Sequence, residues 1–473
     1  MTICNYVKQV HSGEIDIVEQ IAKVIEEIKK INKEYNYFNI ISEESALEQA
    51  KELAKRKDKS KLKLVGVPVS VKDCICVKDV ESRAGSKILN GYKPVFDATV
   101  IKKAKEAGAI IIGKTSQDEF GFGSFSLNVG IGFNIPLNPL DKERVCGGSS
   151  GGSAGITAKI THPHISIAES TGGSIACPAA FCGISGLTPT YGRVSRYGLM
   201  DYANSLDKIG TMAKNVEDSA YLLEIISGFE DRESTSLDTP VDKFSEYAKE
   251  KCKGMKVGII KEAFGEGVEP EVGKIIKDGI SKLEKEGVKV EEVSLPLTMK
   301  YSLSAYYLIA MSEASTNLAK YCGMRYGVSG KLEGNFNEYF SKIRSENFGT
   351  EAKRRIMLGT FARMAGYRDA YYLKALSVRT KIIQEYKKVF KRFDAIVSPT
   401  MPFTAPRIND VKKLTPLQNY MADIMTVGPN VAGLPHISVK AGESKGMPVG
   451  IMFISDHLME KNVIRLGSAV EVK

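Results

Sequence analysis

Two runs of glycine and serine, at 147–153 and 171–174, constrain this chain more than any other feature. Glycine has no Cβ, so its backbone can approach another group closely. A serine hydroxyl becomes a nucleophile when a base lies beside it. The two runs therefore surround possible nucleophiles with residues that let a ligand come close, and the chain offers little else for acyl chemistry. The sequence predicts a reactive site here, and it remains to decide which serine attacks and which group activates it.

The hydrophobic pattern around these runs alternates between the periods of strands and helices. Strands are predicted at 64–73, 109–112, 255–260, 288–293, 395–397, 436–439 and 449–454. Helices are predicted at 14–32, 97–107, 215–228, 269–286 and over most of 300–392, including a long one at 351–392, and Ser42 is expected to cap a further helix. The strand–helix–strand succession over 255–293 is a βαβ-like unit, so we expect an α/β protein.

Composition narrows the classes of protein that this chain can belong to. It carries a net charge of +10, eight cysteines and five histidines. The charge permits contact with nucleic acid, but lysines spread over a solvated surface explain it more simply. No apolar run approaches the ~20 residues of a membrane span, and residues 1–10 lack the core of a signal peptide, so we expect a cytoplasmic protein. Without a Cys-x-x-Cys pair, and with few histidines, we expect free thiols and no metal site.

Three familiar motifs match this sequence by pattern, but the residues around each match do not suit the structure that the motif requires. Gly108–Thr115 matches a P-loop, yet its four variable residues are Ala and three Ile, which are typical of a strand and not of a phosphate-binding turn. The first run also matches the nucleophile elbow of α/β-hydrolases, but 141–146 is a poor core strand and no histidine is marked as a partner. Ser60–Lys63 matches Ser-x-x-Lys, but it lies in a hydrophilic loop without the companion motifs.

A serine–lysine arrangement fits the second run better. Ser174 opens a predicted helix at 175–181, and backbone N–H groups at a helix start attract developing negative charge. An oxyanion pocket can therefore form just ahead of this serine, from Thr171, Gly172 and Gly173.

The base for such a serine would be a lysine, because no histidine is placed for the role. A free lysine has a pKa of about 10.4, and burial lowers it toward neutrality. Lys72, at the end of an apolar strand, is the candidate, although its position alone favours an ordinary surface lysine.

Three segments together resemble the amidase signature family: Val71–Asp73, 147–153 and 171–183. The resemblance implies a Ser–Ser–Lys triad, with Lys72 as the base, Ser149 as the bridging serine and Ser174 as the nucleophile. It also implies a cis peptide before the bridging serine, between Gly148 and Ser149.

The fold implied by the resemblance is one large mixed β-sheet surrounded by helices. On this basis we expect an N-terminal helical segment at 1–62 and one catalytic domain at 63–473. A helical and βαβ region at about 229–350 is a possible insertion in that domain.

Further segments resemble the A subunits of tRNA-dependent amidotransferases, a branch of the same family: 186–198, 205–210, 325–327, 353–359 and 430–435. Such a subunit hydrolyses glutamine through an acyl-enzyme and needs no cofactor of its own. Its ammonia travels to a B subunit, which uses ATP and Mg²⁺ to amidate Glu-tRNA(Gln) or Asp-tRNA(Asn), and a small C subunit tethers the pair. The resemblance assigns the binding of free glutamine to Tyr306, Arg355 and Asp423, but leaves open whether Arg354 or Arg355 holds the carboxylate.

Three departures from the family pattern lie beside the site. Ser170 stands where the family usually has Asp, Thr188 stands where Lys is common, and the gap between the two runs is one residue longer than usual, around 158–164. These departures leave the triad positions and the reaction class intact. Two other functions are alternatives to the amidotransferase subunit. One is a stand-alone amidase that acts on a small or aryl amide, and the other is a non-catalytic scaffold that retains the fold.

Overall fold

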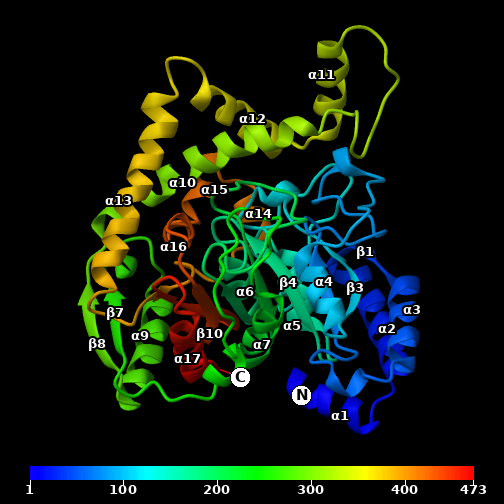
Figure 1. The fold of residues 1–473 in the computed structure, drawn as a ribbon. Coiled ribbons are helices and arrows are strands. Elements are labelled where there is room, and N and C mark those ends of the chain that lie inside the picture. The colour runs from blue at the N-terminus through cyan, green and yellow to red at the C-terminus, as the bar shows by residue number, and fades with distance from the viewer. Residues whose placement is uncertain (473) are drawn as a thin grey trace.

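One mixed sheet of eleven strands runs through the molecule, with helices packed around it (Figure 1). The computed structural model describes residues 1–472. The strands are β1 (Phe38–Ile41), β2 (Pro68–Lys72), β3 (Ile110–Thr115), β4 (Ile165–Ser170), β5 (Ser185–Thr188), β6 (Lys208–Ala213), β7 (Lys256–Ile260), β8 (Lys289–Val293), β9 (Ala395–Pro399), β10 (His436–Ser444) and β11 (Met447–Ser455). Their order in the sheet is β1-β3-β2-β4-β6-β5-β10-β11-β9-β7-β8. The predicted α/β class and single mixed sheet are confirmed.

The direction of the strands decides which loops meet. β2 runs parallel to both β3 and β4, whereas β4, β6, β5, β10, β11 and β9 follow one another in antiparallel pairs. Val71 of β2 lies opposite Ile167 of β4. Because the carboxyl ends of parallel strands share an edge, the residues that end β2 and β4 come together there.

Helices connect the strands and form the outer layers. They are α1 (Ile3–Ser12), α2 (Ile17–Tyr35), α3 (Glu43–Lys55), α4 (Thr99–Glu106), α5 (Gly151–Lys159), α6 (Ala176–Cys182), α7 (Val216–Ile226), α8 (Phe244–Tyr247), α9 (Pro270–Lys285), α10 (Pro296–Asn317), α11 (Phe336–Asn347), α12 (Thr350–Arg363), α13 (Lys374–Val389), α14 (Ile408–Val411), α15 (Pro416–Met421), α16 (Val427–Val431) and α17 (Glu460–Val470). Short 3₁₀ turns are η1 (Lys59–Lys61), η2 (Lys87–Leu89), η3 (Glu119–Gly121), η4 (Lys261–Phe264) and η5 (Leu318–Lys320), and η6 (Asp369–Leu373) is a π-helical turn. None of the described helices is long and apolar enough to cross a bilayer.

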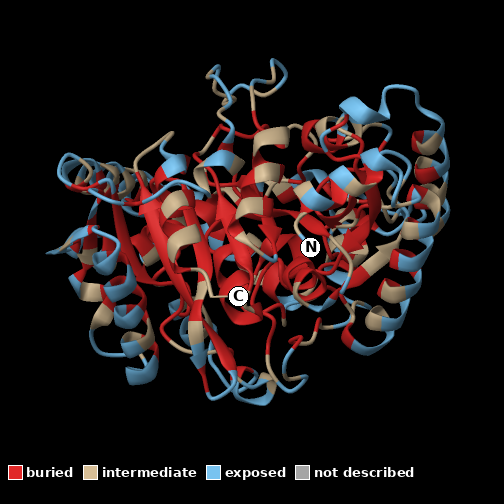
Figure 2. Ribbon diagram, turned by 90° about the horizontal axis from the view of Figure 1, so that it is seen from below, coloured by how far each residue is buried: buried red, intermediate tan, exposed pale blue. Residues whose placement is uncertain are grey.

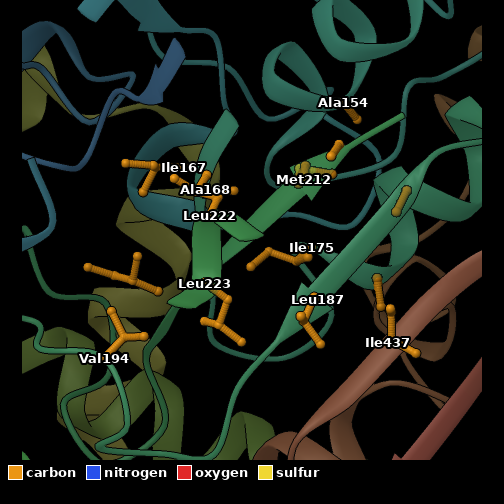
Figure 3. Packing of buried hydrophobic residues seen from close by; sticks show 14 of the residues in the cluster. Ala154, Ile167, Ala168, Ile175, Leu187, Val194, Met212, Leu222, Leu223 and Ile437 are labelled. Carbon is orange, nitrogen blue, oxygen red and sulfur yellow. The ribbon is translucent and has the colours of Figure 1, made fainter. Parts of the chain in front are cut away.

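Alternation along β6 shows how two layers of helices enclose the sheet. The Thr211 hydroxyl donates to the Ser219 carbonyl of α7 at 2.8 Å. The next residue, Met212, points the other way, toward Ala154 of α5 (Figure 3). Strands buried on both faces need apolar or small residues throughout, and the interior of the sheet is accordingly almost entirely buried (Figure 2).

Most of the predicted elements are present, with differences that have local causes. The four variable residues of the P-loop pattern lie in or beside β3, as predicted. Ser42 does precede α3, but its hydroxyl makes no capping hydrogen bond, so that part of the prediction was wrong. The long helix predicted at 351–392 is interrupted, because α12 ends at Arg363 and Gly366 adopts a left-handed φ of 86° before α13 begins.

Candidate active site

Lys72 is fully buried at the end of β2, so it is not a surface lysine. Its side chain points to the same face of the sheet as Ser70, toward the start of α5, because residues two apart on a strand share a face. The Nζ atom lies 2.7 Å from the Ser149 Oγ atom. It also lies 2.9 Å from the main-chain oxygen and 2.9 Å from the Oε2 atom of Glu169.

The first glycine–serine run forms the turn that leads into α5. The peptide between Gly148 and Ser149 is cis, as the family resemblance implied. Side chains crowd this turn. A Cβ atom on Gly148 would lie 2.2 Å from the Asp118 Oδ2 atom, and one on Gly151 would lie 2.3 Å from the Ser126 Oγ atom. Glycine is therefore required by close approach at both positions.

Ser174 lies two residues ahead of α6 and is almost buried. Its carbonyl accepts a hydrogen bond from the Ser150 N–H at 3.3 Å, which joins the two runs. Within the described part of the chain, the Ser174 hydroxyl makes no hydrogen bond, so the contact from Ser149 to Ser174 that a triad needs is not closed here. Geometry of this kind often tightens only when substrate binds.

Several backbone N–H groups just ahead of Ser174 have no hydrogen-bond acceptor within the described residues. Over residues 1–472, the N–H groups of the predicted oxyanion residues Thr171, Gly172 and Gly173 donate to no protein acceptor, and neither does that of Ser174. Their carbonyls are held instead: that of Gly172 accepts from the Asn430 Nδ2 atom, and that of Gly173 accepts from the Cys177 N–H. Fixed peptides with unused donors are what an oxyanion pocket requires.

Two carboxyl groups, those of Glu169 and Asp207, lie beside the Thr171 side chain. The Thr171 hydroxyl lies 2.7 Å from the Glu169 Oε1 atom and 2.7 Å from the Asp207 Oδ1 atom. Asp207 also accepts from the backbone N–H groups of Tyr202 and Ala203. Burial and the neighbouring Glu169 raise the pKa of Asp207 well above its ordinary value. The Thr171 side chain therefore belongs to a buried acid cluster.

Arg355 and Arg354 differ completely in their surroundings. The side chain of Arg355 is 3% exposed and that of Arg354 is 36% exposed. Arg355 donates from Nε to Glu351 at 2.8 Å and from Nη1 to the Tyr202 hydroxyl at 2.6 Å. Its guanidinium is enclosed by four aromatic rings, those of Phe122, Tyr202, Tyr307 and Tyr420. Arg355 is thus the arginine that points inward.

Asp423 is a buried carboxyl group on the far side of the same aromatic cluster. The Tyr307 hydroxyl donates to its Oδ2 atom at 2.6 Å, and burial raises its pKa. Tyr306 packs edge-on against Tyr307, with ring centroids 4.9 Å apart, and also covers the second run, because a Cβ atom on Gly172 would be 2.6 Å from its ring. The structure therefore gathers Tyr306, Arg355 and Asp423 around one aromatic cluster, with Tyr307 as the direct partner of Asp423.

Sequence reasoning overlooked Glu169, Asp207, Asp118 and Tyr307. Only Glu169 carried a visible signal, because it is a charged residue inside an otherwise apolar or small strand, Ile165–Ser170. The others are brought to the site by packing between distant segments. Among residues 1–472, no group of three or more His, Cys, Asp or Glu side chains is arranged to hold a metal ion.

Comparison with known proteins agrees with this geometry. The family model described as Amidase matches residues 19–464. The chain is 49% identical, over 89% of its length and 88% of the relative's, to the A subunit of the glutamyl-tRNA(Gln) amidotransferase of Methanococcoides burtonii. It is 46% identical to the corresponding protein of Methanosarcina mazei, over 96% of this chain and 93% of the relative.

A solved structure extends the likeness to three dimensions. The crystal structure of the glutamyl-tRNA(Gln) amidotransferase A subunit from Thermotoga maritima superposes with a TM-score of 0.79 and 37% identity, covering 96% of this chain and 91% of that one. The residues matched by the family model include both glycine–serine runs and Lys72. The chain therefore belongs to the amidase signature family, as its sequence motifs predicted.

Proposed function

We propose that this chain is the glutaminase subunit of a tRNA-dependent amidotransferase. The observation that carries the proposal is that Arg355 and Asp423 are both buried around one aromatic cluster beside the Lys72–Ser149 contact. Gly121 lies between the two, since a Cβ atom there would be 3.7 Å from the Tyr202 ring and 3.5 Å from the Ser149 Oγ atom. A guanidinium and a carboxylate suit the α-carboxylate and α-ammonium groups of a free amino acid. Similarity to named A subunits over most of the chain supports the same assignment.

In this proposal Ser174 attacks the side-chain amide carbon of glutamine. Its Oγ–H proton passes to Ser149, whose own proton passes to the Nζ atom of Lys72. The backbone N–H groups of Thr171, Gly172 and Gly173, together with that of Ser174, are available to stabilise the oxygen that becomes negative. Collapse of the intermediate breaks the C–N bond, and the proton held by Lys72 returns to the departing ammonia. Water then hydrolyses the acyl-enzyme by the same proton path in reverse and releases glutamate.

The ammonia would be consumed on a partner. The relatives' name specifies glutamyl-tRNA(Gln). We therefore propose a cytoplasmic heterotrimer in which a B subunit uses ATP and Mg²⁺ to convert Glu-tRNA(Gln), Asp-tRNA(Asn) or both, and a small C subunit tethers it to this chain. The partner selects the acceptor tRNA, and this chain needs no cofactor of its own.

Ser174→Ala tests the proposal in the assembled complex. We expect the variant to release no ammonia from glutamine and to lose glutamine-dependent amidation of charged tRNA. Added ammonium chloride should still support amidation, because the partner's chemistry is untouched. Ammonia release by the variant at the wild-type rate would refute the role of Ser174. Hydrolysis of simple aryl amides by the isolated wild-type chain, without preference for glutamine, would instead identify a stand-alone amidase.

A further inference from the structure

Glu169 is a carboxylate partner of Lys72, and such a partner favours the charged ammonium form, which cannot act as a base. An ammonium group has three N–H donors, and Lys72 has three acceptors within reach: the Ser149 Oγ atom at 2.7 Å and two oxygens of Glu169 at 2.9 Å. In this arrangement every Nζ proton is used and no lone pair faces Ser149. A nearby carboxylate also stabilises the charged form of a lysine. Lys72 can serve as a base only if a neighbouring group accepts one of its Nζ protons.

Among residues 1–472, the Oε2 atom of Glu169 is the one carboxylate oxygen in contact with the Nζ atom of Lys72, and it can accept a proton from it. The side chains of Lys72 and Glu169 are 0% and 4% exposed. Burying an ion pair costs desolvation free energy that a neutral amine–carboxylic acid pair does not incur, so burial favours transfer of the proton from nitrogen to oxygen.

We infer that Glu169 is the residue that receives a proton from Lys72 and thereby makes it a base. The inference rests on the proposed function, because it deepens the mechanism of the same site. One Nζ–H bond breaks and one Oε2–H bond forms. The amine then turns about its Cε–Nζ bond and presents its lone pair to the Ser149 hydroxyl. When Lys72 has passed the proton it takes from Ser149 on to the leaving ammonia, Glu169 returns its proton to Nζ.

Thr171 and Asp207 extend this acid–base pair. One hydroxyl has one proton, yet Thr171 lies 2.7 Å from both carboxyl groups. The arrangement is satisfied when Asp207 is protonated and donates to Thr171, which in turn donates to Glu169. Two adjacent buried carboxylates do not ionise together readily. Asp207 therefore acts as a neutral donor that orients the Glu169 carboxylate toward Lys72.

Other titratable groups surround Lys72 and belong to the pH dependence. Asp118 lies beside Gly148 and accepts from the backbone of Ser126 and Asn128, and burial raises its pKa to about 6. Burial also raises the pKa of the Cys74 thiol and lowers the pKa of Lys114 behind it. Among the described residues, Glu169 is the titratable side chain that hydrogen-bonds to the Nζ atom of Lys72, whereas Asp118, Cys74 and Lys114 do not.

Glu169→Gln tests the inference in the assembled complex, through the pH dependence of kcat/KM for glutamine hydrolysis between about pH 5.5 and 10. Glutamine keeps the shape of the side chain but cannot accept the proton. We expect a loss of about 100-fold at pH 7, within the range of general acid–base contributions. The acidic limb of the profile should move to higher pH, with partial recovery near pH 9, because the free amine must now form by losing a proton to solvent.

Two results would overturn the inference. If the acidic limb of the kcat/KM profile of Glu169→Gln moves to lower pH, then Glu169 only stabilises the ammonium form of Lys72. A uniform loss with an unchanged profile would mean that it only supports the structure. Glu169→Asp keeps an acid and should keep the wild-type limb at reduced rate, which provides a second variant if Glu169→Gln folds poorly. Glu460→Gln is a matched control, because Glu460 is equally buried but bonds the Thr190 N–H at 2.9 Å outside the site.

The rate at which a fluorophosphonate probe labels Ser174 separates this inference from the proposed function. Labelling needs the activated serine but no particular substrate. If the wild type labels with the expected pH profile but does not hydrolyse glutamine, the proposed function fails and the role of Glu169 stands. If the wild type hydrolyses glutamine but Glu169→Gln is labelled with the wild-type pH profile, the inferred role of Glu169 is refuted and the proposed function stands. Absence of labelling in the wild type would refute an activated Ser174, and with it the inference.

Discussion

Arg354 and Arg355 are neighbours in the sequence and occupy opposite environments on α12. A motif match aligns both and cannot separate them, because the difference comes from the four rings that only packing assembles around Arg355. The pair therefore provides a matched experiment on the proposed glutamine pocket. Each arginine can be replaced by lysine, which keeps the charge but loses the planar fork and the stacking on aromatic rings.

Arg355→Lys should raise KM for glutamine by about 10- to 100-fold, since a hydrogen bond to a charged group contributes roughly 1.5–3 kcal/mol. Arg354→Lys should change KM less than about twofold, because that side chain is 36% exposed. Steady-state ammonia release measures both. Equal effects of the two substitutions, or a larger effect at Arg354, would contradict the assignment of Arg355 to the substrate carboxylate.

At the scale of residues, the sequence predicted those site residues that lie within short motifs. Lys72, Ser149 and Ser174 were assigned from short segments that match a family, and the structure brings Lys72 and Ser149 within 2.7 Å. Glu169 was not assigned, because its contact with Lys72 depends on the parallel pairing of β2 with β4. Tyr307 was not assigned, because consecutive residues on a helix point in different directions and the sequence does not fix which one faces Asp423.

At the scale of elements, hydrophobic periodicity predicted β2, β3, β7 to β11 and most of the amphipathic helices. It missed the strands β1, β4, β5 and β6, and it also missed α5. Its first residues are Gly151 and Gly152, and glycine disfavours helices by about 1 kcal/mol relative to alanine. Glycine is nevertheless required there, because a Cβ atom on Gly152 would lie 2.5 Å from the Tyr37 carbonyl oxygen. Close packing of the turn onto the sheet overrides the local preference.

The crossing of α10 and α12 depends on one glycine in the same way. A Cβ atom on Gly359 would lie 1.8 Å from the Met311 carbonyl oxygen, and Gly359 is one helical turn beyond Arg355. Gly359→Ala should lower the free energy of unfolding by about 1–3 kcal/mol through overpacking. It should also reduce kcat/KM for glutamine, because α12 must shift and carries Arg355 with it.

Gly273→Ala in α9 is the control for that substitution. A Cβ atom on Gly273 would meet nothing within 4 Å, so we expect stability to stay the same or to rise by up to about 1 kcal/mol. Urea unfolding and ammonia release measure both variants. Equal stability of the two variants, with unchanged activity, would show that the crossing of α10 and α12 tolerates a methyl group.

At the scale of the whole molecule, the strand order could not be read from the sequence. β1 and β3 pair at one edge, and β7 and β8, which follow β6 in the chain, are added beyond β9 at the other. Such an order depends on pairings between segments far apart in the sequence, whose registers are set by shared burial. The family resemblance implied the single mixed sheet, and hydrophobic periodicity predicted seven of its eleven strands, but neither predicted which strands are neighbours.

Buried carboxyl groups also tie distant parts of this sheet protein together and make its stability depend on pH. Glu119 in η3 accepts from the Gly349 N–H at 2.9 Å, just ahead of α12, and contacts the Ser86 hydroxyl. Burial raises its pKa to about 7 from an ordinary 4.5. A carboxyl group with a raised pKa stabilises the fold most below pH 4.5, and this contribution is lost as pH rises toward and through about 7.

Glu119→Gln removes that titration and keeps the shape and hydrogen-bonding capacity of the side chain. The variant should therefore gain stability relative to the wild type between pH 5 and pH 7.5, by at most about 3 kcal/mol, because each pKa unit corresponds to about 1.4 kcal/mol. Urea unfolding at the two pH values measures this difference. The exposed Glu284→Gln should show no such change. A stability difference for Glu119→Gln that is the same at both pH values would mean that Glu119 does not gain its proton on folding.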